Sequence, residues 1–173
     1  HATGYRVSDL VFSVVTFSPM RFVRDERHLQ GAGSDFFVLE MQLSGEQTLQ
    51  MDGECRRLLP RHVHLRDWSC GFEAEATAMS LQSIMIPRRR LQFGSALGSG
   101  NPVISWSMDA PDGRMLSLLW RELLAVLEQV SLAEAEGLAQ AFLGFLDGLL
   151  GRQATQDTPV TFGAMQQYLM VRL

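Results

Sequence analysis

The chain has 173 residues, of which 46% are hydrophobic and 20% are charged. This composition is typical of a folded globular domain and excludes disordered, collagen-like and disulfide-scaffold proteins. The formal net charge is −4, so the chain lacks the overall basic charge of a nucleic-acid-binding domain. All 15 side chains counted as Lys or Arg are arginines, which excludes lysine Schiff-base chemistry and a P-loop nucleotide site.

Three features of the sequence concern its cellular compartment and its extent: the cysteines, the apolar runs and the chain ends. Cys55 and Cys70 are too few for a disulfide framework, so reduced thiols are expected. No apolar run reaches the roughly eighteen residues that a membrane span needs, and a cytoplasmic location is expected. The sequence begins at His1 without Met and ends at Leu173 inside a helical pattern. We expect both ends to be cut.

The first half of the chain is predicted to form β-strands. Short segments alternate apolar and polar residues, or are rich in β-branched and aromatic residues, and turn residues separate them. Asp52-Gly53 is a strong hairpin signal between two of them. The predicted strands cover residues 7–17, 37–43, 48–51, 62–66 and 79–86. Their number and spacing indicate an antiparallel sandwich or barrel.

The second half is predicted to be helical. A helix begins near Asp109-Ala110-Pro111 and carries apolar residues at helical spacing to residue 130. Ser131 and Glu134 form a capping box for a second helix, which ends at Gly151. A polar linker follows over residues 153–158, and a third helical pattern begins at residue 162. The expected fold class is therefore α+β, with the sheet first and a layer of two to three helices after it.

The pair His62 and His64 has the spacing of a metal site on a strand. A third ligand would come from one of four candidates: His28, Cys55, Asp67 or Cys70. Val63 and Leu65 alternate with the histidines and take the inner face of the strand, so both histidines are expected on a solvated outer face. We therefore expect no metal and no cofactor.

Ligand binding is considered for a few arginine and large apolar side chains. We assign Arg21, Arg24 and Arg27 to an early strand. From there, Arg27 could bind a ligand carboxylate through a bidentate hydrogen bond. The alternative is exposed arginines paired with acidic neighbours. The apolar candidates, which could equally be plain core, are Met41, Trp68, Phe72 and Trp106.

Enzyme chemistry finds little support in the sequence. It contains no Gly-x-Ser-x-Gly motif, phosphate loop or dinucleotide fingerprint, so we expect a protein that is not an enzyme. The basic cluster Arg88-Arg89-Arg90 is interpreted as a solvated strand end. The first helix is apolar around more than one side and needs a second surface, either the neighbouring helix or a second subunit. The candidate dimer residues are Leu116, Leu119, Trp120, Leu123 and Leu127.

The order of these motifs resembles a known family. Ser18-Pro19 ends an early strand, LSGEQTLQMDGE surrounds a turn and a hairpin, and Ile84-Met85-Ile86-Pro87-Arg88 closes the strand region. Leu59-Pro60 and Val63-His64-Leu65-Arg66-Asp67 stand between them. Together they resemble the cupin-like, ligand-binding sensor domain of AraC-type transcription regulators. The family usually has Gly and then an acidic residue where this chain has Arg61 and His62.

The resemblance implies three regions: a cupin-like sensor over 1–108, a helical dimerisation segment over 109–152, and a linker with the start of a truncated DNA-binding region over 153–173. It implies a bacterial regulator that binds a small-molecule effector, forms a homodimer and reaches DNA only through a helix-turn-helix domain missing from this chain. Two alternatives stay open. One is a stand-alone metal-dependent cupin enzyme using His62 and His64, and the other is a ligand-free assembly domain.

Overall fold

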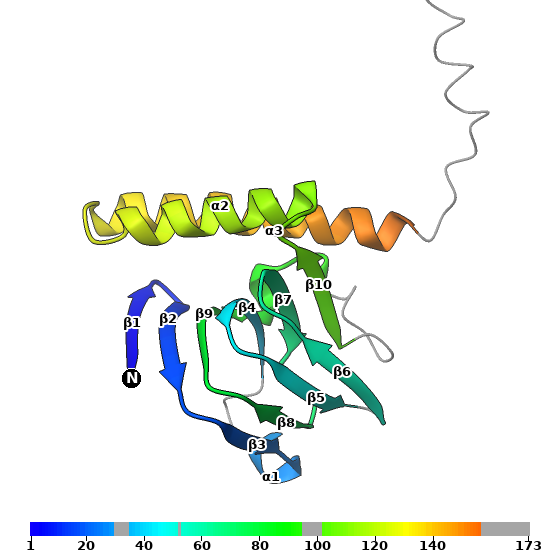
Figure 1. Ribbon diagram of the computed structural model, residues 1–173. Helices are drawn as coiled ribbons and strands as arrows, with labels where there is room; N and C mark the ends of the chain where they lie inside the picture. Colours follow the sequence, from blue (N-terminus) through cyan, green and yellow to red (C-terminus); the bar gives the residue numbers. More distant parts are fainter. Residues whose placement is uncertain (30–34, 52, 95–101, 157–173) are drawn as a thin grey trace, which may run out of the picture.

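The computed structural model describes residues 1–29, 35–51, 53–94 and 102–156, which form two β-sheets and a helical layer (Figure 1). The six-stranded sheet has the order β1 (Ala2–Val7), β2 (Leu10–Phe17), β9 (Met79–Pro87), β4 (Phe36–Ser44), β7 (His62–Asp67) and β10 (Val103–Ser107). The four-stranded sheet has the order β3 (Met20–Arg24), β8 (Phe72–Ala76), β5 (Gln47–Met51) and β6 (Glu54–Leu58). The helices are α1 (Glu26–Leu29), the 3₁₀ turn η1 (Arg88–Arg90), α2 (Pro111–Val126) and α3 (Leu132–Gln156).

Every strand pair is antiparallel. The expected class, an antiparallel sandwich followed by a helical layer, is confirmed. One predicted strand is corrected, because residues 7–17 form the end of β1 and all of β2. A turn at Ser8, whose φ of 56° is in the left-handed region, pairs Val7 with Leu10. Strands β1, β6, β8 and β10 were not predicted, although β8 alternates apolar residues with Glu73 and Glu75.

The central strands β4, β7 and β9 of the large sheet are buried on both faces, whereas most of the edge strand β1 is exposed. Along β7, Val63 and Leu65 belong to the core shared with α2 and α3, while Arg66 lines the space between the sheets and His64 alternates onto the same face as Arg66. His64 is only 2% exposed. The expectation that both histidines lie on a solvated face is therefore wrong for His64, because a second sheet covers the side of the strand that looked wet.

The helices confirm the predicted start signals and extend one predicted end. Helix α2 has Pro111 in its first turn. Ser131 Oγ accepts a hydrogen bond from the backbone N–H of Glu134, whose carboxylate accepts one from the Ser131 N–H at 2.9 Å, so the capping box is present. Helix α3 does not end at Gly151 but continues to Gln156. The third helical pattern, from residue 162, lies outside the described residues.

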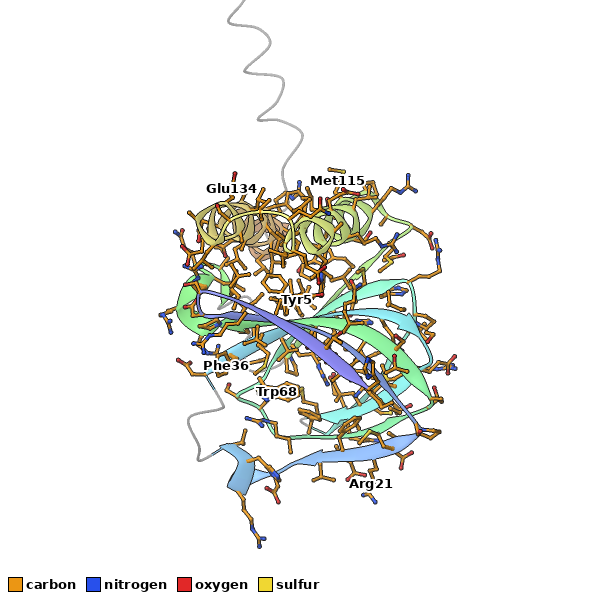
Figure 2. The ribbon with its side chains drawn as sticks, turned by 90° about the vertical axis from the view of Figure 1, so that its left-hand side faces the viewer. Tyr5, Arg21, Phe36, Trp68, Met115 and Glu134 are labelled. Atoms are coloured by element: carbon orange, nitrogen blue, oxygen red, sulfur yellow. The ribbon has the colours of Figure 1, made fainter. Side chains whose placement is uncertain are left out.

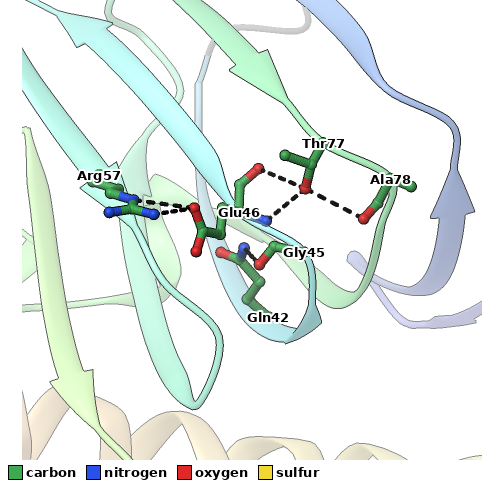
Figure 3. A network of polar contacts seen from close by, with 6 residues as sticks. All are labelled: Gln42, Gly45, Glu46, Arg57, Thr77 and Ala78. Carbon is green, nitrogen blue, oxygen red and sulfur yellow. Dashed lines mark hydrogen bonds and ion pairs between the residues drawn. The ribbon is translucent and has the colours of Figure 1, made fainter.

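Two corners of the sandwich are tied together where the chain passes between the sheets (Figure 3). Thr77, at the corner between β8 and β9, accepts a hydrogen bond on Oγ1 from the N–H of Glu46, at the corner between β4 and β5 (2.9 Å). The Glu46 carbonyl in turn accepts one from the Thr77 N–H (3.0 Å). The Gln42 side chain donates to the Gly45 carbonyl at 2.7 Å, and Arg57 pairs with the Glu46 carboxylate.

Gly45 is required at this corner for two separate reasons. Its φ is +78°, and a Cβ there would lie 2.4 Å from the Ala78 carbonyl oxygen. Gly53 has nearly the same φ, +77°, but a Cβ there would meet nothing within 4 Å. An Ala substitution at Gly53 would therefore introduce backbone strain alone, whereas one at Gly45 would introduce both backbone strain and steric overlap.

We predict that Gly53→Ala lowers the free energy of unfolding by about 1–2 kcal/mol, the cost of a Cβ in the left-handed region. Gly45→Ala should cost clearly more, because the overlap with Ala78 is added to that strain. Denaturant unfolding of the two variants measures both values. Equal losses for the two variants would contradict the prediction, since they would show that the backbone near Ala78 shifts to accommodate the added Cβ at no measurable cost.

Candidate ligand-binding cavity

A cavity of about 210 Å³ lies between the two sheets. The large sheet contributes strands β2, β4, β7 and β9, the small sheet contributes β3, β5 and β8, and Trp68 comes from the loop after β7 (Figure 2). The lining residues are mostly apolar: Val15, Phe17, Phe22, Val38, Glu40, Gln47, Arg66, Trp68, Phe72, Leu81, Ser83 and Met85. A concave apolar space with few polar groups has the general form of a small-molecule site.

A buried ion pair forms the polar part of the cavity. Arg66 Nη2 donates to Glu40 Oε1 at 2.5 Å, and the two side chains are 3% and 10% exposed. They reach each other because β4 and β7 are neighbours in the sheet, with Val38 opposite Arg66. Burial of a charged pair is costly unless each polar atom is satisfied. Among the described residues, Nε and Nη1 of Arg66 have no hydrogen-bond partner.

Aromatic rings surround the Arg66 guanidinium. Its central carbon lies 5.2 Å from the Trp68 ring centroid and 5.0 Å from that of Phe72, and the two rings meet edge to face at 5.2 Å. Arg24 also approaches the Trp68 ring, at 5.0 Å, and donates from Nε to the Trp68 carbonyl at 2.9 Å. Burial lowers the pKa of Arg24. Trp68 thus contacts two guanidinium groups, an arrangement that cation–π attraction favours.

The loop that carries Trp68 is fixed by hydrogen bonds. Asp67 accepts from the Ser69 N–H at 2.9 Å and also pairs with Arg88. The Trp68 N–H donates to the Phe36 carbonyl at 3.0 Å. Because these bonds hold both the backbone and the flanking side chains, the Trp68 ring is kept in place at the cavity.

His64 lies between the sheets but is already committed to hydrogen bonds. The Leu59 carbonyl accepts from Nε2–H at 3.4 Å, and the Ser105 hydroxyl, 2.8 Å from Nδ1, then donates to that nitrogen. This tautomer, assigned from the partners, leaves no ring lone pair for a metal. Among the residues that the structure describes, no group of three His, Cys, Asp or Glu side chains could hold a metal ion. The residues present do not fit the metal of a catalytic cupin. Cys55 and Cys70 are both thiols.

The structure separates the five residues predicted to bind ligand. Trp68 and Phe72 line the cavity together. Met41 and Trp106 lie on the other face of the large sheet, in the core under the helices. Arg27 is exposed and belongs to α1, not to the early strand that was expected to hold it.

Sequence reasoning missed Glu40 and Arg66. Each stands on the side of its strand that alternates with an apolar core face, and neither was considered as a site residue. Two opposite charges on neighbouring strands, with Trp68 two positions after Arg66, were the available signal. Two opposite charges on one face can be buried together because each pairs with the other, whereas a lone charge is costly to bury.

The predicted dimer residues are also divided. Leu116, Trp120 and Leu123 are at most 5% exposed and pack in the core between the helices and the large sheet. Leu119 is 37% exposed, and Leu127 is half-buried. Since helix α2 uses its most apolar stripe against its own sheet, three of the five side chains are covered within the single chain.

The pH dependence of stability should report on His64, since burial lowers its pKa from 6.5 to about 4. Its folded-state pKa lies below its unfolded value, so the unfolded chain binds the extra proton between these values and stability falls as the pH drops through this window. Between pH 7 and about pH 4.5 this one group should remove about 2 kcal/mol. Denaturant unfolding at both pH values should show a smaller loss for His64→Gln than for the wild type. An identical loss in the two proteins would contradict the prediction.

Two solved regulators have a similar fold. The AraC-like transcriptional activator CuxR matches with a TM-score of 0.76 and 14% identity, over 87% of this chain and 55% of CuxR. Apo ToxT from Vibrio cholerae matches with a TM-score of 0.56 and 12% identity, over 84% of this chain and 57% of ToxT. This chain thus spans little more than half the length of either one.

Other comparisons add less. A cupin superfamily protein from Desulfitobacterium hafniense matches 50% of this chain with 18% identity and a TM-score of 0.40, too slight a likeness to carry an argument. No family model and no curated protein sequence matches the chain. No helix among the described residues is long and apolar enough to cross a membrane. The resemblance to AraC-type sensor domains, expected from the order of motifs, is confirmed as a shared fold with the AraC-like regulators CuxR and ToxT.

Proposed function

We propose that this chain is the effector-sensing and dimerising part of a bacterial AraC-type transcription regulator, acting in the cytoplasm and not as an enzyme. The observation that carries the proposal is a largely apolar cavity between two sheets of an AraC-like fold, with the buried side chain of Arg66 beside Trp68 and Phe72. A small molecule bound there is the effector, and no cofactor is required. An effector acts only if it binds one state of the regulator more tightly than another.

Three regions divide this work in the proposal. Residues 1–108 hold the effector, and residues 109–152 form the dimer segment, whose second helix α3 continues to Gln156 at the start of the linker. Residues 153–173 lead toward a DNA-binding domain. The net charge of −4 suits a part that does not itself contact DNA. The matched regulators are nearly twice as long as the region this chain covers, which supports a further domain.

The proposed dimer surface is the outer groove between α2 and α3. This groove of about 360 Å³ is lined by Leu119, Glu122, Leu123, Val126, Val130, Leu138, Ala141 and Phe142. Leu119 and Leu138 are 37% and 42% exposed on its rim. Gly144 and Gly148 on α3 would have open space around an added Cβ, so a second helix could approach closely there. A second copy of this chain is the proposed occupant.

We predict that Leu119→Arg and Leu138→Arg each convert a dimer into a monomer in analytical ultracentrifugation, because a charge would be buried at the contact. Met20→Arg is the matched control, since Met20 is 43% exposed on β3 of the small sheet, away from the helices. All three variants should keep the melting temperature of an exposed-site substitution. A dimer that survives both helix substitutions would remove this surface from the proposal.

The regulator assignment is tested by reading the gene beyond the codon for Leu173. We expect a continuation of about one hundred residues that is basic and carries helix-turn-helix patterns. In this proposal that segment contacts DNA and the sensor part does not. A stop codon directly after Leu173 would overturn the assignment and leave a free-standing sandwich.

A further inference from the structure

Arg66 has more hydrogen-bonding capacity than the described residues use. Its side chain is 3% exposed and lines the cavity, and its Nη2 donates to Glu40. Nε and Nη1 are buried without a partner in the described part of the chain, although they carry three N–H groups between them. The neighbouring rings of Trp68 and Phe72 attract the guanidinium but offer it no lone pair. Since buried polar groups are mostly hydrogen-bonded, an acceptor on a ligand would complete this site.

The charges that line the cavity favour an acceptor without a charge. Arg66 and Glu40 are the charged side chains among the described lining residues, and they neutralise each other. Arg24 is not one of these lining residues, and its Nε donates to the Trp68 carbonyl. An anionic ligand would therefore bring a charge without a partner into a poorly hydrated space, where it would compete with Glu40 for one guanidinium. An uncharged oxygen avoids both costs.

The walls of the cavity favour one aromatic ring. Two pairs of aromatic side chains line it, and each pair meets edge to face: Phe17 with Phe22 at 5.4 Å, and Trp68 with Phe72 at 5.2 Å. A further ring can pack against such side chains in the same geometry. An engineered protein cavity of about 150 Å³ holds benzene. The volume of about 210 Å³ found here therefore admits one ring with about two or three further non-hydrogen atoms.

The remaining polar side chains favour a single polar group on the ligand. Gln47 and Ser83 complete the polar lining, and the Ser83 hydroxyl already shares a hydrogen bond with that of Ser13 at 2.6 Å. The hydroxyl groups of a sugar would mostly face apolar side chains, where they would lack partners. A carbonyl oxygen has two lone pairs and brings no donor of its own. It therefore supplies what the unpaired N–H groups of Arg66 lack.

We propose that the effector is an uncharged aromatic carbonyl compound, of which an aryl ketone is the simplest form. Its carbonyl oxygen accepts hydrogen bonds from the unpaired N–H groups of Arg66, and its ring packs against Trp68 and Phe72. Glu40 engages Nη2 and leaves Nε and Nη1 for the ligand. This inference rests on the proposed function, since it names the chemical class that the same cavity takes.

The test is isothermal titration of the purified chain with three probes of nearly the same shape. Acetophenone carries the carbonyl group, ethylbenzene has a methylene group in its place, and benzoate has a charged oxygen in place of the methyl group. We expect acetophenone to bind at millimolar concentration or tighter. Ethylbenzene should bind at least about tenfold more weakly, because it leaves the Arg66 donors unpaired. Benzoate should also bind at least about tenfold more weakly, because its charge has no partner.

A double variant reports on Arg66 directly. Arg66→Met alone would leave the Glu40 carboxylate buried without a partner, so Glu40→Met is combined with it, and circular dichroism and melting check the fold. This variant should prefer acetophenone over ethylbenzene by less than about twofold, because no donor remains for the carbonyl. The matched control combines Arg21→Met with Glu73→Met. Arg21 lies on the outer side of the small sheet (Figure 2), where these two side chains form an exposed ion pair, so the control should keep the wild-type preference.

The outcomes separate this inference from the proposed function. Equal binding of acetophenone and ethylbenzene by the wild type, or an unchanged preference in the double variant, overturns the role of Arg66 while a sensing cavity stands. Benzoate binding more tightly than acetophenone overturns the argument for an uncharged ligand. If none of the probes binds, the carbonyl proposal fails, while the gene sequence beyond Leu173 still decides the regulator assignment. If the double variant does not fold, the three probes on the wild type decide alone.

Discussion

The structure depends on one constraint: the central strands β4, β7 and β9 of the large sheet are buried on both faces. A strand in such a sheet alternates between two interiors and not between core and solvent. Along β7, Leu65 belongs to the core under the helices, and Arg66 belongs to the space between the sheets. The helix-side core is built mainly of apolar side chains, and its large members Leu39, Leu65 and Trp120 are fully buried. The space between the sheets contains the buried charges and the cavity.

This division explains where binding capacity can exist. A close-packed apolar core gains stability from every filled volume and leaves no room for a ligand. The second interior is filled less completely, and it accommodates a charged pair whose desolvation lowers stability unless its hydrogen bonds are complete. Arg66 and Glu40 meet that condition only in part. An incompletely satisfied buried ion pair lowers stability, and such local costs are typical of functional positions.

The same constraint sets how much the sequence could predict. Alternation located β4, β7 and β9, the Asp-Gly pair located the hairpin, and Ser131 with Glu134 located the start of α3. These signals depend on neighbours in the chain, and each holds without tertiary knowledge. In contrast, local sequence does not show which way each face of a strand points. Which side of β7 meets helices and which meets a sheet depends on elements remote in sequence, so His64 was assigned to solvent and Arg66 was not recognised as a cavity residue.

Two smaller departures have the same origin. Gly151 is an ordinary stop signal, yet α3 passes it because Phe93, which a Cβ on Gly151 would contact at 3.2 Å, packs closely against the helix there. Trp106 and Met41 are large apolar residues on strands, as a pocket would require, but β10 and β4 turn them to the helices. In both cases tertiary packing overrode a local pattern.

The two faces of β7 also show how occupancy of the cavity can reach the helices. Arg66 and Leu65 are adjacent on one strand, so a ligand that draws on the guanidinium acts on a backbone whose next side chain packs with Trp120 in the helix-side core. Close-packed interiors transmit small displacements because they cannot be compressed locally. Under the proposed function, a ligand changes the regulator only to the extent that the two states position Arg66 and Trp68 differently. A ligand contacting only the small sheet, which does not pack on α2 or α3, lacks that direct path.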